Sequence, residues 1–479
     1  MKKIIVIAFL LFASFAQAQH ETETHHKYIA PGDPMVIKKI SEWQDLKFGL
    51  FMHWGTYSQW GIVESWSLCP EDEGWTERKG PYAKNYSEYV KAYENLQTTF
   101  NPVQFNPEKW VSAANKAGMK YMIFTTKHHD GFNMFDTKES DYKITSKKTP
   151  FASNPRSNVT KEIFNAFRKD GFMIGAYFSK PDWNHQNYWW PYFPPKDRNV
   201  NYDVNKYPEK WEAYKTFTYN QIKELMSNYG KVDILWLDGG WVRPLSTIDT
   251  SVSWQKTITI NQDIDMKKIA GMARSYNPGM LVVDRTVTGE YENYTTPEQE
   301  LPNKPLPYPW ETCMTMGGSW SYVPNDTYKS SSSLIHTLIK IVSRGGNLLL
   351  NIGPGPHGDW DPVAYERLSD IGDWMAVNSE AIHATKPVAP YSEGNIFYTQ
   401  SKDGKVIYAH YLFDATNTIL PTSITLSNLP ITKKPAVSLL GSKQKPSVSF
   451  SGNSVTVKTG AGLQKSFGGK HAAVFKIVL

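Results

Sequence analysis

Cysteine is scarce in this sequence, with only two among 479 residues. Small secreted domains without a large core need several disulfides, and two cysteines are too few for such a framework. Cys69 and Cys313 lie far apart in the chain, so the sequence leaves their pairing open. The chain must therefore be stabilised mainly by hydrophobic cores, and its length predicts two domains rather than one.

Long apolar runs are also absent beyond the first residues, so no transmembrane helix is expected. Residues 1–18 begin with two lysines, continue with the short apolar run Ile4–Phe15 and end in Ala-Gln-Ala. This order is typical of a secretory signal peptide, with cleavage between Ala18 and Gln19. We therefore expect a periplasmic or secreted protein, in which residues 19–34 form a polar leader.

Neither sign of charge dominates the sequence. The formal net charge is +6, and removal of two lysines with the signal peptide lowers it to +4. No run of lysine and arginine is interleaved with aromatic residues, so nucleic acid is not an expected partner. Aromatic residues are abundant at 14% of the chain, and exposed aromatic faces suit the C–H surfaces of sugars.

Apolar runs alternate with amphipathic helix patterns over residues 35–387. This alternation predicts a parallel sheet covered by helices, and the length suits a (β/α)8-like TIM barrel. Only six strands are evident, so the barrel is expected to be irregular. The expected strands are 48–54, 121–125, 173–178, 232–237, 280–283 and 347–352. The expected helices are 106–118, 158–169, 208–229, 266–276 and 331–343.

The pattern changes near residue 388. Short, mostly β-branched runs follow one another, with Asp403-Gly404 and Gly452-Asn453 as turns between them. No helix pattern interrupts these runs. Residues 388–479 are therefore predicted to form a small antiparallel β-sandwich.

Polar and aromatic residues gather where the predicted barrel strands end. The segment 234–241 reads ILWLDGGW, so a buried strand ends in the carboxylate Asp238. An Asp-Gly turn is a common and purely structural way to end a strand. However, the carboxyl ends of parallel barrel strands meet on one face, where catalytic side chains are found. The residues that converge there are His53, His128, His129, Tyr177, Trp236, Asp238 and Arg285.

Two kinds of hydrolytic site suit this set. Three histidines and an aspartate are possible metal ligands, but His128 and His129 are adjacent and are expected to point to opposite sides of a strand. A glycosidase instead needs two carboxyl groups, one ionised and one protonated. We therefore interpret Asp238 as a nucleophile surrounded by groups that hold sugar hydroxyls, and expect no metal and no cofactor.

Five segments together resemble the signatures of glycoside hydrolase family 29, the retaining α-L-fucosidases. They are KFGLFMHWGTYS (47–58), KYMIFTTKHHDGFNMFDTKESDY (120–142), GAYFSKPDW (175–183), LWLDGGW (235–241) and GGNLLLNIGPGPHGD (345–359). The family's β-sandwich after the barrel is also similar to the tail. The resemblance implies an exo-acting α-L-fucosidase that works through a covalent fucosyl–enzyme.

The resemblance also implies roles for single residues. Asp238 matches the family's nucleophile, and Glu298, in YTTPEQE, matches its acid/base. Glu311, in PWETC, is the runner-up for the acid/base; Glu290, Glu292 and Glu300 are further candidates from the same region. Positions that match contacts to fucose are His53, Glu64, His128, His129, Tyr177, Trp236, Arg285 and Trp320, although Trp320 suits the core almost equally well.

Two other functions stay open at this point. One is a catalytically silent fucose-binding protein, and the other is a metal-dependent barrel hydrolase. The expected partner is a fucosylated glycan, but the linkage cannot be derived, because leaving-group sites lie on loops such as 60–100 and 185–205. The oligomeric state cannot be derived from the sequence either.

Overall fold

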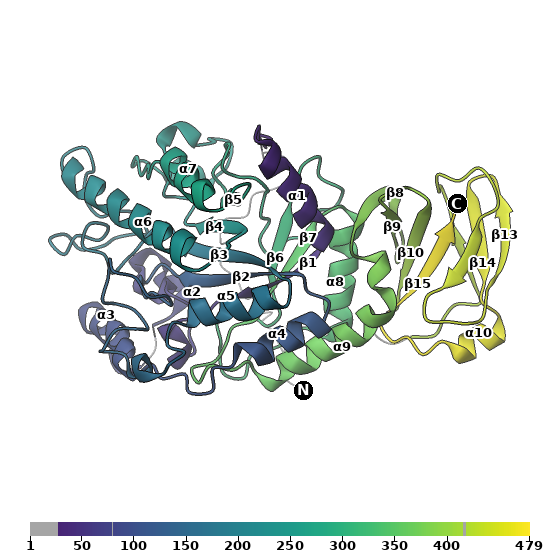
Figure 1. Cartoon of the computed structure of the whole chain (residues 1–479), viewed down its shortest axis with the longest axis horizontal. Helices are drawn as coiled ribbons and strands as arrows, with labels where there is room; N and C mark the ends of the chain where they lie inside the picture. Colours follow the sequence, from purple (N-terminus) through teal and green to yellow (C-terminus); the bar gives the residue numbers. More distant parts are fainter. Residues whose placement is uncertain (1–26, 79, 415–417) are drawn as a thin grey trace, which may run out of the picture.

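The computed structural model describes residues 27–78, 80–414 and 418–479, so the expected signal peptide lies outside the described residues. The chain forms a helix-covered parallel sheet followed by an antiparallel sandwich, which lie at opposite ends of the molecule in Figure 1. Within the described ranges, no helix is both long and apolar enough to cross a membrane.

The first domain is built on seven parallel strands in the order β5-β4-β3-β2-β1-β7-β6. Nearly every residue in them is buried, as expected where helices cover one face of a curled sheet and side chains fill the other. All six expected strands are present, and β6 is an additional one. The strands are β1 (Phe48–Met52), β2 (Tyr121–Lys127), β3 (Met173–Ser179), β4 (Ile234–Asp238), β5 (Leu281–Asp284), β6 (Glu311–Thr315) and β7 (Asn347–Asn351).

The expectation of an eight-stranded barrel needs correction, because the sheet has two edges, β5 and β6. Residues 281–315 are all described, and the gap between these edges is spanned by residues 292–298 through isolated bridges only. Val283 pairs with Glu292 on one side, and Glu298 pairs with Cys313 on the other. A continuous ladder is not formed there because Pro297 lacks an N–H and Gln299 has a positive φ of 56°.

Helices cover the outside of the sheet (Figure 1), and all five expected ones are present. Their starts follow the capping signals: the side chains of Asn106 and Asn158 accept hydrogen bonds from the N–H groups of Lys109 and Lys161. The helices of this domain are α1 (Pro34–Leu46), α2 (Glu73–Thr76), α3 (Tyr86–Glu94), α4 (Pro107–Lys116), α5 (Val159–Lys169), α6 (Pro208–Asn228), α7 (Met266–Tyr276), α8 (Ser331–Ser343) and α9 (Pro362–Asn378).

Helix α1 has a different position from the other helices. Its buried side chains Val36, Ile40 and Trp43 belong to the same cluster as the inward-facing strand residues, including Tyr121 and Leu281 near the strand starts. Trp43 also stacks on Tyr294, at 4.0 Å between ring centroids. The amino end of the curled sheet is therefore plugged by apolar side chains, which leaves the carboxyl end for a site.

The second domain consists of two antiparallel sheets, β12-β15-β10-β9-β8 and β11-β14-β13, with an apolar core between them. Contrary to the expectation of a segment without helix, α10 (Gly460–Ser466) interrupts it. The strands are β8 (Thr385–Glu393), β9 (Ile396–Ser401), β10 (Val406–Leu412), β11 (Ser423–Leu426), β12 (Ala436–Leu439), β13 (Ser447–Ser451), β14 (Ser454–Lys458) and β15 (Ala472–Val478).

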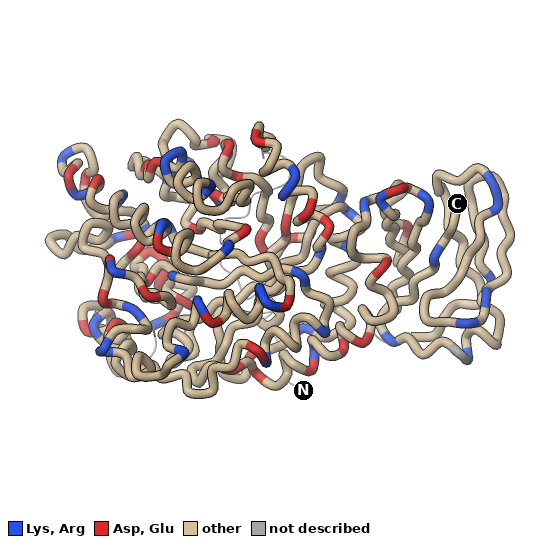
Figure 2. Tube along the Cα trace, viewed as in Figure 1, with Lys and Arg blue, Asp and Glu red and all other residues tan. Residues whose placement is uncertain are grey.

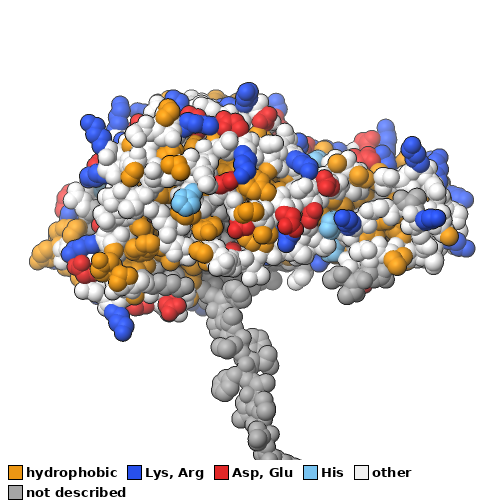
Figure 3. Space-filling model, turned by 90° about the horizontal axis from the view of Figure 1, so that it is seen from below, with side chains coloured by type: hydrophobic (Ala, Val, Ile, Leu, Met, Phe, Trp, Pro, Cys, Tyr) orange, Lys and Arg blue, Asp and Glu red, His pale blue; other side chains and the backbone are white. Residues whose placement is uncertain are grey.

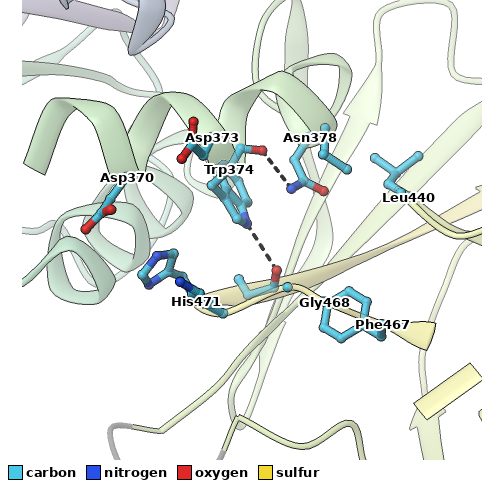
Figure 4. A pocket seen from close by; sticks show the side chains of 13 residues that line it. Asp370, Asp373, Trp374, Asn378, Leu440, Phe467, Gly468 and His471 are labelled. Atoms are coloured by element: carbon cyan, nitrogen blue, oxygen red, sulfur yellow. Dashed lines mark hydrogen bonds between the residues drawn. The ribbon is translucent and has the colours of Figure 1, made fainter. Parts of the chain in front are cut away.

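The two domains share a buried interface. Phe397 of β9 and Val474 of β15 belong to the same hydrophobic cluster as α8 and α9. Between α9 and the sandwich lies a cavity of about 330 Å³ (Figure 4), where Trp374 Nε1 donates to the carbonyl oxygen of Ala472 at 3.0 Å. No residue named above at a strand end lines this cavity.

Charge is distributed unevenly between the domains. Residues 385–479 contain eleven lysines, no arginine and only three acidic residues. Figure 2 accordingly shows few acidic positions on the sandwich and a mixture of both signs on the barrel-like domain. The positive charge of the sandwich thus lies at the end of the molecule opposite to the loops after β1 and β3 (Figure 1).

Candidate active site

The end of β4 is shaped by two glycines. A Cβ on Gly239, which has φ 90°, would lie 2.3 Å from Pro181 Cδ, and one on Gly240 would lie 2.0 Å from Thr286 Oγ1. A larger residue at either position would have to displace the side chain of Pro181 or Thr286. The close packing holds Asp238 beside the loops that follow β3 and β5, and the Lys180 N–H donates to the Asp238 carbonyl at 2.9 Å.

Asp238 is surrounded by groups that favour its ionised form. The Tyr177 hydroxyl donates to Oδ2 at 2.8 Å, and Arg285 Nη1 donates to Oδ1 at 3.3 Å. Burial opposes ionisation, but the positive charge of Arg285, together with His129 and Tyr177, lowers the pKa of Asp238 to about 2. The side chain keeps 14% exposure. Asp238 is therefore an oriented, charged carboxylate that stays open on one side.

Arg285 connects Asp238 to a second carboxylate. Its Nη2 forms a short hydrogen bond and ion pair with Glu298 Oε2, and its Nε donates to Thr296 Oγ1 at 3.2 Å. The guanidinium carbon lies 5.4 Å from the ring centroid of Trp236. One buried cation is thus shared by two carboxylates, of which Glu298 lies on the segment that fills the gap in the sheet.

His53 and His128 are held through one ring nitrogen each. His53 Nδ1 lies 2.8 Å from Asn351 Oδ1, and His128 Nδ1 lies 2.6 Å from Ser65 Oγ. The Asn351 amide donates to the Trp320 carbonyl at 2.6 Å, so its oxygen accepts from His53 Nδ1–H. Burial lowers the pKa of His53 to about 4 and that of His128 well below its usual range. Both imidazoles are therefore neutral at physiological pH.

His129 is held by packing alone. Neither ring nitrogen has a hydrogen-bond partner among the described residues, and Nε2 lies 3.8 Å from Asp238 Oδ2. Burial lowers its pKa to about 3, although Asp238 acts in the opposite direction. Three indole rings surround the imidazole at centroid distances of 5.0, 5.2 and 5.2 Å; they belong to Trp66, Trp183 and Trp241. Unsatisfied buried nitrogens of this kind are suited to an incoming ligand.

The expectation that His128 and His129 point apart is wrong. Strand β2 ends at Lys127 after a register shift, so both histidines lie in the following turn with ring centroids 4.2 Å apart. Together with Asp238 they offer three atoms within 4.8 Å of one another, which is a possible metal site. The donor set suits a cation poorly, because the guanidinium of Arg285 already bonds the one carboxylate in it.

Glu64 lies close to Glu298. Its Oε1 accepts the Ser321 N–H at 2.5 Å, while Oε2 has no partner among the described residues. Burial raises the pKa of Glu64 to about 8, and the charge of Glu298 adds to this rise. Trp320 precedes Ser321 in the chain, and its ring centroid lies 5.2 Å from that of His53. Glu64 is therefore a protonated carboxyl group at neutral pH, next to the ionisable groups of the site.

Glu311, the runner-up for the acid/base, lies at the wrong end of the sheet. It is the first residue of β6, where its Oε2 accepts the hydroxyl of Tyr121, the first residue of β2, at 2.6 Å. Burial raises its pKa to about 8. Asp238 is the last residue of its strand, so the two carboxyl groups lie at opposite ends. Of the candidates considered from the sequence, Glu298 is the one that shares Arg285 with Asp238.

Trp236, which was expected to contact the sugar, is only 1% exposed and lies beneath the surface of the site. It stacks on Tyr177 at 5.3 Å beneath Arg285. Sequence reasoning did not single out several partners that the structure brings in. These are Ser65, Trp66, Trp183, Thr296 and Asn351, most of which lie within or close to the motifs quoted above.

Two buried ion pairs lie at the ends of β2 and β3. Lys180 Nζ lies 2.5 Å from Asp284 Oδ1, and Lys127 Nζ lies 3.0 Å from Asp182 Oδ2. Each lysine immediately follows or ends a strand that carries site residues. Since breaking one partner of a buried pair leaves an uncompensated charge, these pairs fix the loops on which the site depends.

The chain is similar to known proteins over most of its length. The chain is 27% identical over 448 residues to tissue alpha-L-fucosidase of Homo sapiens, covering 89% of this chain and 88% of that protein. It is also 27% identical over 402 residues to alpha-L-fucosidase of Branchiostoma floridae, covering 80% and 81%.

Solved structures show the same relationship. Alpha-L-fucosidase isoenzyme 1 from Paenibacillus thiaminolyticus superposes with a TM-score of 0.73 at 27% identity, covering 93% of this chain and 99% of that one. The Thermotoga maritima alpha-fucosidase in complex with a mechanism-based inhibitor has a TM-score of 0.68 at 25% identity, covering 95% and 100%. The family model described as alpha-L-fucosidase matches residues 15–380. The chain therefore belongs to the alpha-L-fucosidase family, glycoside hydrolase family 29.

Proposed function

We propose that this protein is an exo-acting, retaining α-L-fucosidase that releases terminal fucose from fucosylated glycans. One observation carries the proposal: a single buried guanidinium bonds both Asp238 and Glu298. Retaining glycosidases place their two carboxyl groups about 5–5.5 Å apart, closer than inverting enzymes do. Two carboxyl groups within reach of one arginine fit the shorter separation.

Asp238 is the proposed nucleophile. Its ionised form is favoured by Arg285, and the Tyr177 hydroxyl fixes the orientation of Oδ2. Attack on the anomeric carbon forms the ester bond of a fucosyl–enzyme while the bond to the leaving group breaks. Glu298 is the proposed acid/base. It is ion-paired with Arg285 in the unliganded protein, so this role requires that it takes up a proton from solvent as substrate binds. It then gives this proton to the leaving oxygen and takes one from the attacking water.

The neutral histidines are proposed to bind the sugar. A neutral imidazole both donates and accepts hydrogen bonds, which suits hydroxyl groups, whereas an imidazolium only donates. His53 and His128 are each held through Nδ1, which leaves Nε2 for a sugar hydroxyl. Both ring nitrogens of His129 lack a partner among the described residues. Trp320 beside His53 is proposed to contact the same sugar, and Trp236 to support Arg285 from below.

The segment 292–298 is proposed to take the place of the eighth strand in a (β/α)8-like barrel. Its bridges to β5 and β6 on either side support this interpretation. Export through a cleaved signal peptide remains a prediction from the sequence.

The proposed function is tested by replacing the two carboxyl groups. Asp238→Gly is expected to abolish hydrolysis of an aryl α-L-fucoside, and azide should restore part of the activity. For Glu298→Ala, turnover of poor leaving groups should fall more than that of activated aryl ones, because protonation matters most for poor leaving groups. Full activity in Asp238→Gly would remove this residue from the nucleophile role.

The alternatives have distinct outcomes in the same experiment. A catalytically silent binding protein would bind fucose without releasing any product over long incubation. The grouping of His128, His129 and Asp238 beside the other site residues is the observation on which a metal-dependent hydrolase would rest. We expect activity to survive a strong chelator, and its loss with recovery on adding metal would support that alternative instead.

A further inference from the structure

The connection between β3 and α6 carries an unusual concentration of aromatic residues, reading WNHQNYWWPYF over residues 183–193. It begins directly after β3, the strand that supplies Tyr177. Only Trp183 of this segment took part in the site described above. The remaining rings require an explanation, because large aromatic side chains that stay partly exposed commonly mark a binding surface.

The aromatic surface is continuous with the site. The ring of Trp183 lies 5.2 Å from His129, and Trp189 stacks on Trp183 at 5.0 Å with an interplanar angle of 7°. Trp189 is fixed in this orientation because its Nε1 donates to the Asn199 carbonyl at 3.0 Å. Two parallel indole rings therefore lead outward from the histidine nearest to Asp238.

The next residue in the chain, Trp190, begins a second group of rings that reaches the outside of the molecule. Trp190 stacks on Tyr192 at 5.2 Å, and Tyr192 is 73% exposed. Figure 3 shows hydrophobic side chains gathered at the end of the molecule away from the sandwich, the end at which the loops after β1 and β3 lie in Figure 1. The rings are held in place by Asn201, whose side chain accepts from Trp190 N at 2.7 Å and donates to the Phe193 carbonyl at 2.7 Å.

Arg198 fastens this loop to the other loops of the site. Its carbonyl accepts hydrogen bonds from Trp183, Tyr188 and Trp241 at 3.3, 2.9 and 3.0 Å. Its guanidinium pairs with Glu71 and Asp72 at 3.0 and 2.9 Å. The aromatic surface is thus preorganised, so a ligand that stacks on it pays little ordering entropy.

We propose that Trp189 and Tyr192 form a subsite for the leaving group, with Trp190 supporting Tyr192, and that this leaving group is a saccharide of two or more sugar units. The inference rests on the proposed fucosidase function. In the proposed function the fucose unit lies at Asp238. The sugar on the other side of the bond that breaks, which is the leaving group, must therefore lie on the surface next to this position. An exposed aromatic face binds the C–H face of a sugar ring. The Trp190 ring already contacts Lys210 Nζ, 4.0 Å from its centroid, as well as Tyr192, so it supports Tyr192 and does not contact the sugar. Two ring-to-ring steps of 5.2 and 5.0 Å lead from His129 through Trp183 to Trp189, a path long enough for more than one sugar unit.

The test compares two substrates in wild type and in Tyr192→Ala. The substrates are an aryl α-L-fucoside and a panel of neutral α1,2-, α1,3-, α1,4- and α1,6-fucosylated oligosaccharides of three to six units. For the best oligosaccharide we expect KM to rise about tenfold with kcat little changed, as for loss of an interaction made equally in ground and transition states. The constants for the aryl fucoside should stay within about twofold.

Two control variants make the result specific. Tyr192→Phe keeps the ring and should retain the wild-type KM. Tyr276→Ala removes an aromatic residue that is 46% exposed at the end of α7, and should change neither substrate. An unchanged KM for every oligosaccharide in Tyr192→Ala, or an equal change for both substrate classes, would overturn the subsite. Wild-type protein that hydrolyses neither class would instead overturn the proposed function and the subsite with it.

Discussion

At the scale of single residues, the site depends on how one positive charge is divided. Arg285 bonds Asp238 and Glu298 through different nitrogens while its third nitrogen bonds Thr296. A lysine has a single charged nitrogen and cannot reproduce this planar, three-way arrangement. The orientation of both carboxyl groups is therefore set by one side chain.

Replacing Arg285 should change both the rate and its pH dependence. Arg285→Gln is expected to lower kcat/KM on an aryl fucoside roughly 100-fold or more, as for other preorganised electrostatic groups. Because Arg285 holds the pKa of Asp238 down at about 2, its loss raises that pKa, and the acidic limb of the pH–rate profile should move to higher pH. Arg285→Lys, which keeps a charge, should shift the limb less. An unmoved limb in both variants would contradict the assigned cause.

Much of the residue set was predictable from the sequence, and the failures have physical reasons. Asp238, Arg285 and the three histidines converge because strand ends in a parallel sheet share one face. The relative orientation of His128 and His129 was predicted wrongly because strand alternation was extended past Lys127, where β2 already ends. The contact between Arg285 and Glu298 could not be derived, since it depends on an irregular segment without periodicity.

At the scale of secondary-structure elements, the accuracy of the predicted helices and strands depended on how clear their sequence pattern was. Helices with an asparagine cap and a clear apolar face were predicted within one or two residues. Strand β6 was missed because its sequence, ETCMT, alternates polar residues and lacks the apolar run of its neighbours. The start of α1 has a good cap in Asp33, but the helix packs against the sheet interior, a position that no sequence pattern indicates.

The crossing after β4 offers a test at this scale. Gly240→Ala is expected to destabilise the protein by about 1–3 kcal/mol, because the added Cβ must displace Thr286 and with it the neighbouring Arg285. Activity should therefore fall as well. Gly271→Ala in α7 is the control: a Cβ there meets nothing within 4 Å, and alanine favours the helix. Thermal unfolding and aryl fucoside assays would show the contrast, and equal effects would contradict it.

Glu311, at the amino end of the sheet, should make the stability of the protein depend on pH. Glu311 has its pKa raised to about 8 by burial, so it is protonated in the folded protein at neutral pH. In the unfolded chain the pKa of a glutamate is roughly 4.3, and in the folded protein that of Glu311 is about 8. The contribution of Glu311 to the free energy of unfolding is therefore fully present below pH ~4.3 and is lost as the pH rises through about 8. Glu311→Gln should therefore stabilise the protein at pH 9 relative to wild type, by about 1–3 kcal/mol, with little difference near pH 4.

The same variant separates two roles for Glu311. Because this residue lies at the strand starts, Glu311→Gln should keep activity on an aryl fucoside within about threefold. Tm measured against pH, together with the activity at pH 6, is the required experiment. A loss of activity comparable to that of Glu298→Ala would return Glu311 to consideration as the acid/base.

At the scale of the whole molecule, the sandwich has its own core but also contributes a few side chains to the core of the first domain. The aromatic ring of Phe397 packs on α8, with the side-chain charges of Lys340 and Arg344 each 5.9 Å from its centroid. It is 6% exposed and belongs to the same hydrophobic cluster as the helices around the parallel sheet. The sandwich lies at the end of the molecule away from the loops of the site, so we expect it to contribute to stability.

A shared core predicts cooperative unfolding of the two domains. We expect calorimetry of the complete protein to show a single transition, because neither domain keeps its apolar surface covered without the other. Phe397→Ala should lower the Tm of that single transition, at a cost of about 3–5 kcal/mol. Two well-separated transitions in the wild-type protein, with only one of them moved by the variant, would contradict this view.

The gap in the parallel sheet has an evolutionary consequence. Glu298 is carried by a stretch that is tied to its neighbours at a few isolated points, whereas Asp238 ends a strand paired on both sides. Insertions and deletions are tolerated in irregular connections far more readily than in paired strands. We therefore expect the spacing to the second carboxylate to vary more among related enzymes than the position of the first. Descendants of one ancestor could thus acquire new preferences for what is cleaved without rebuilding the scaffold.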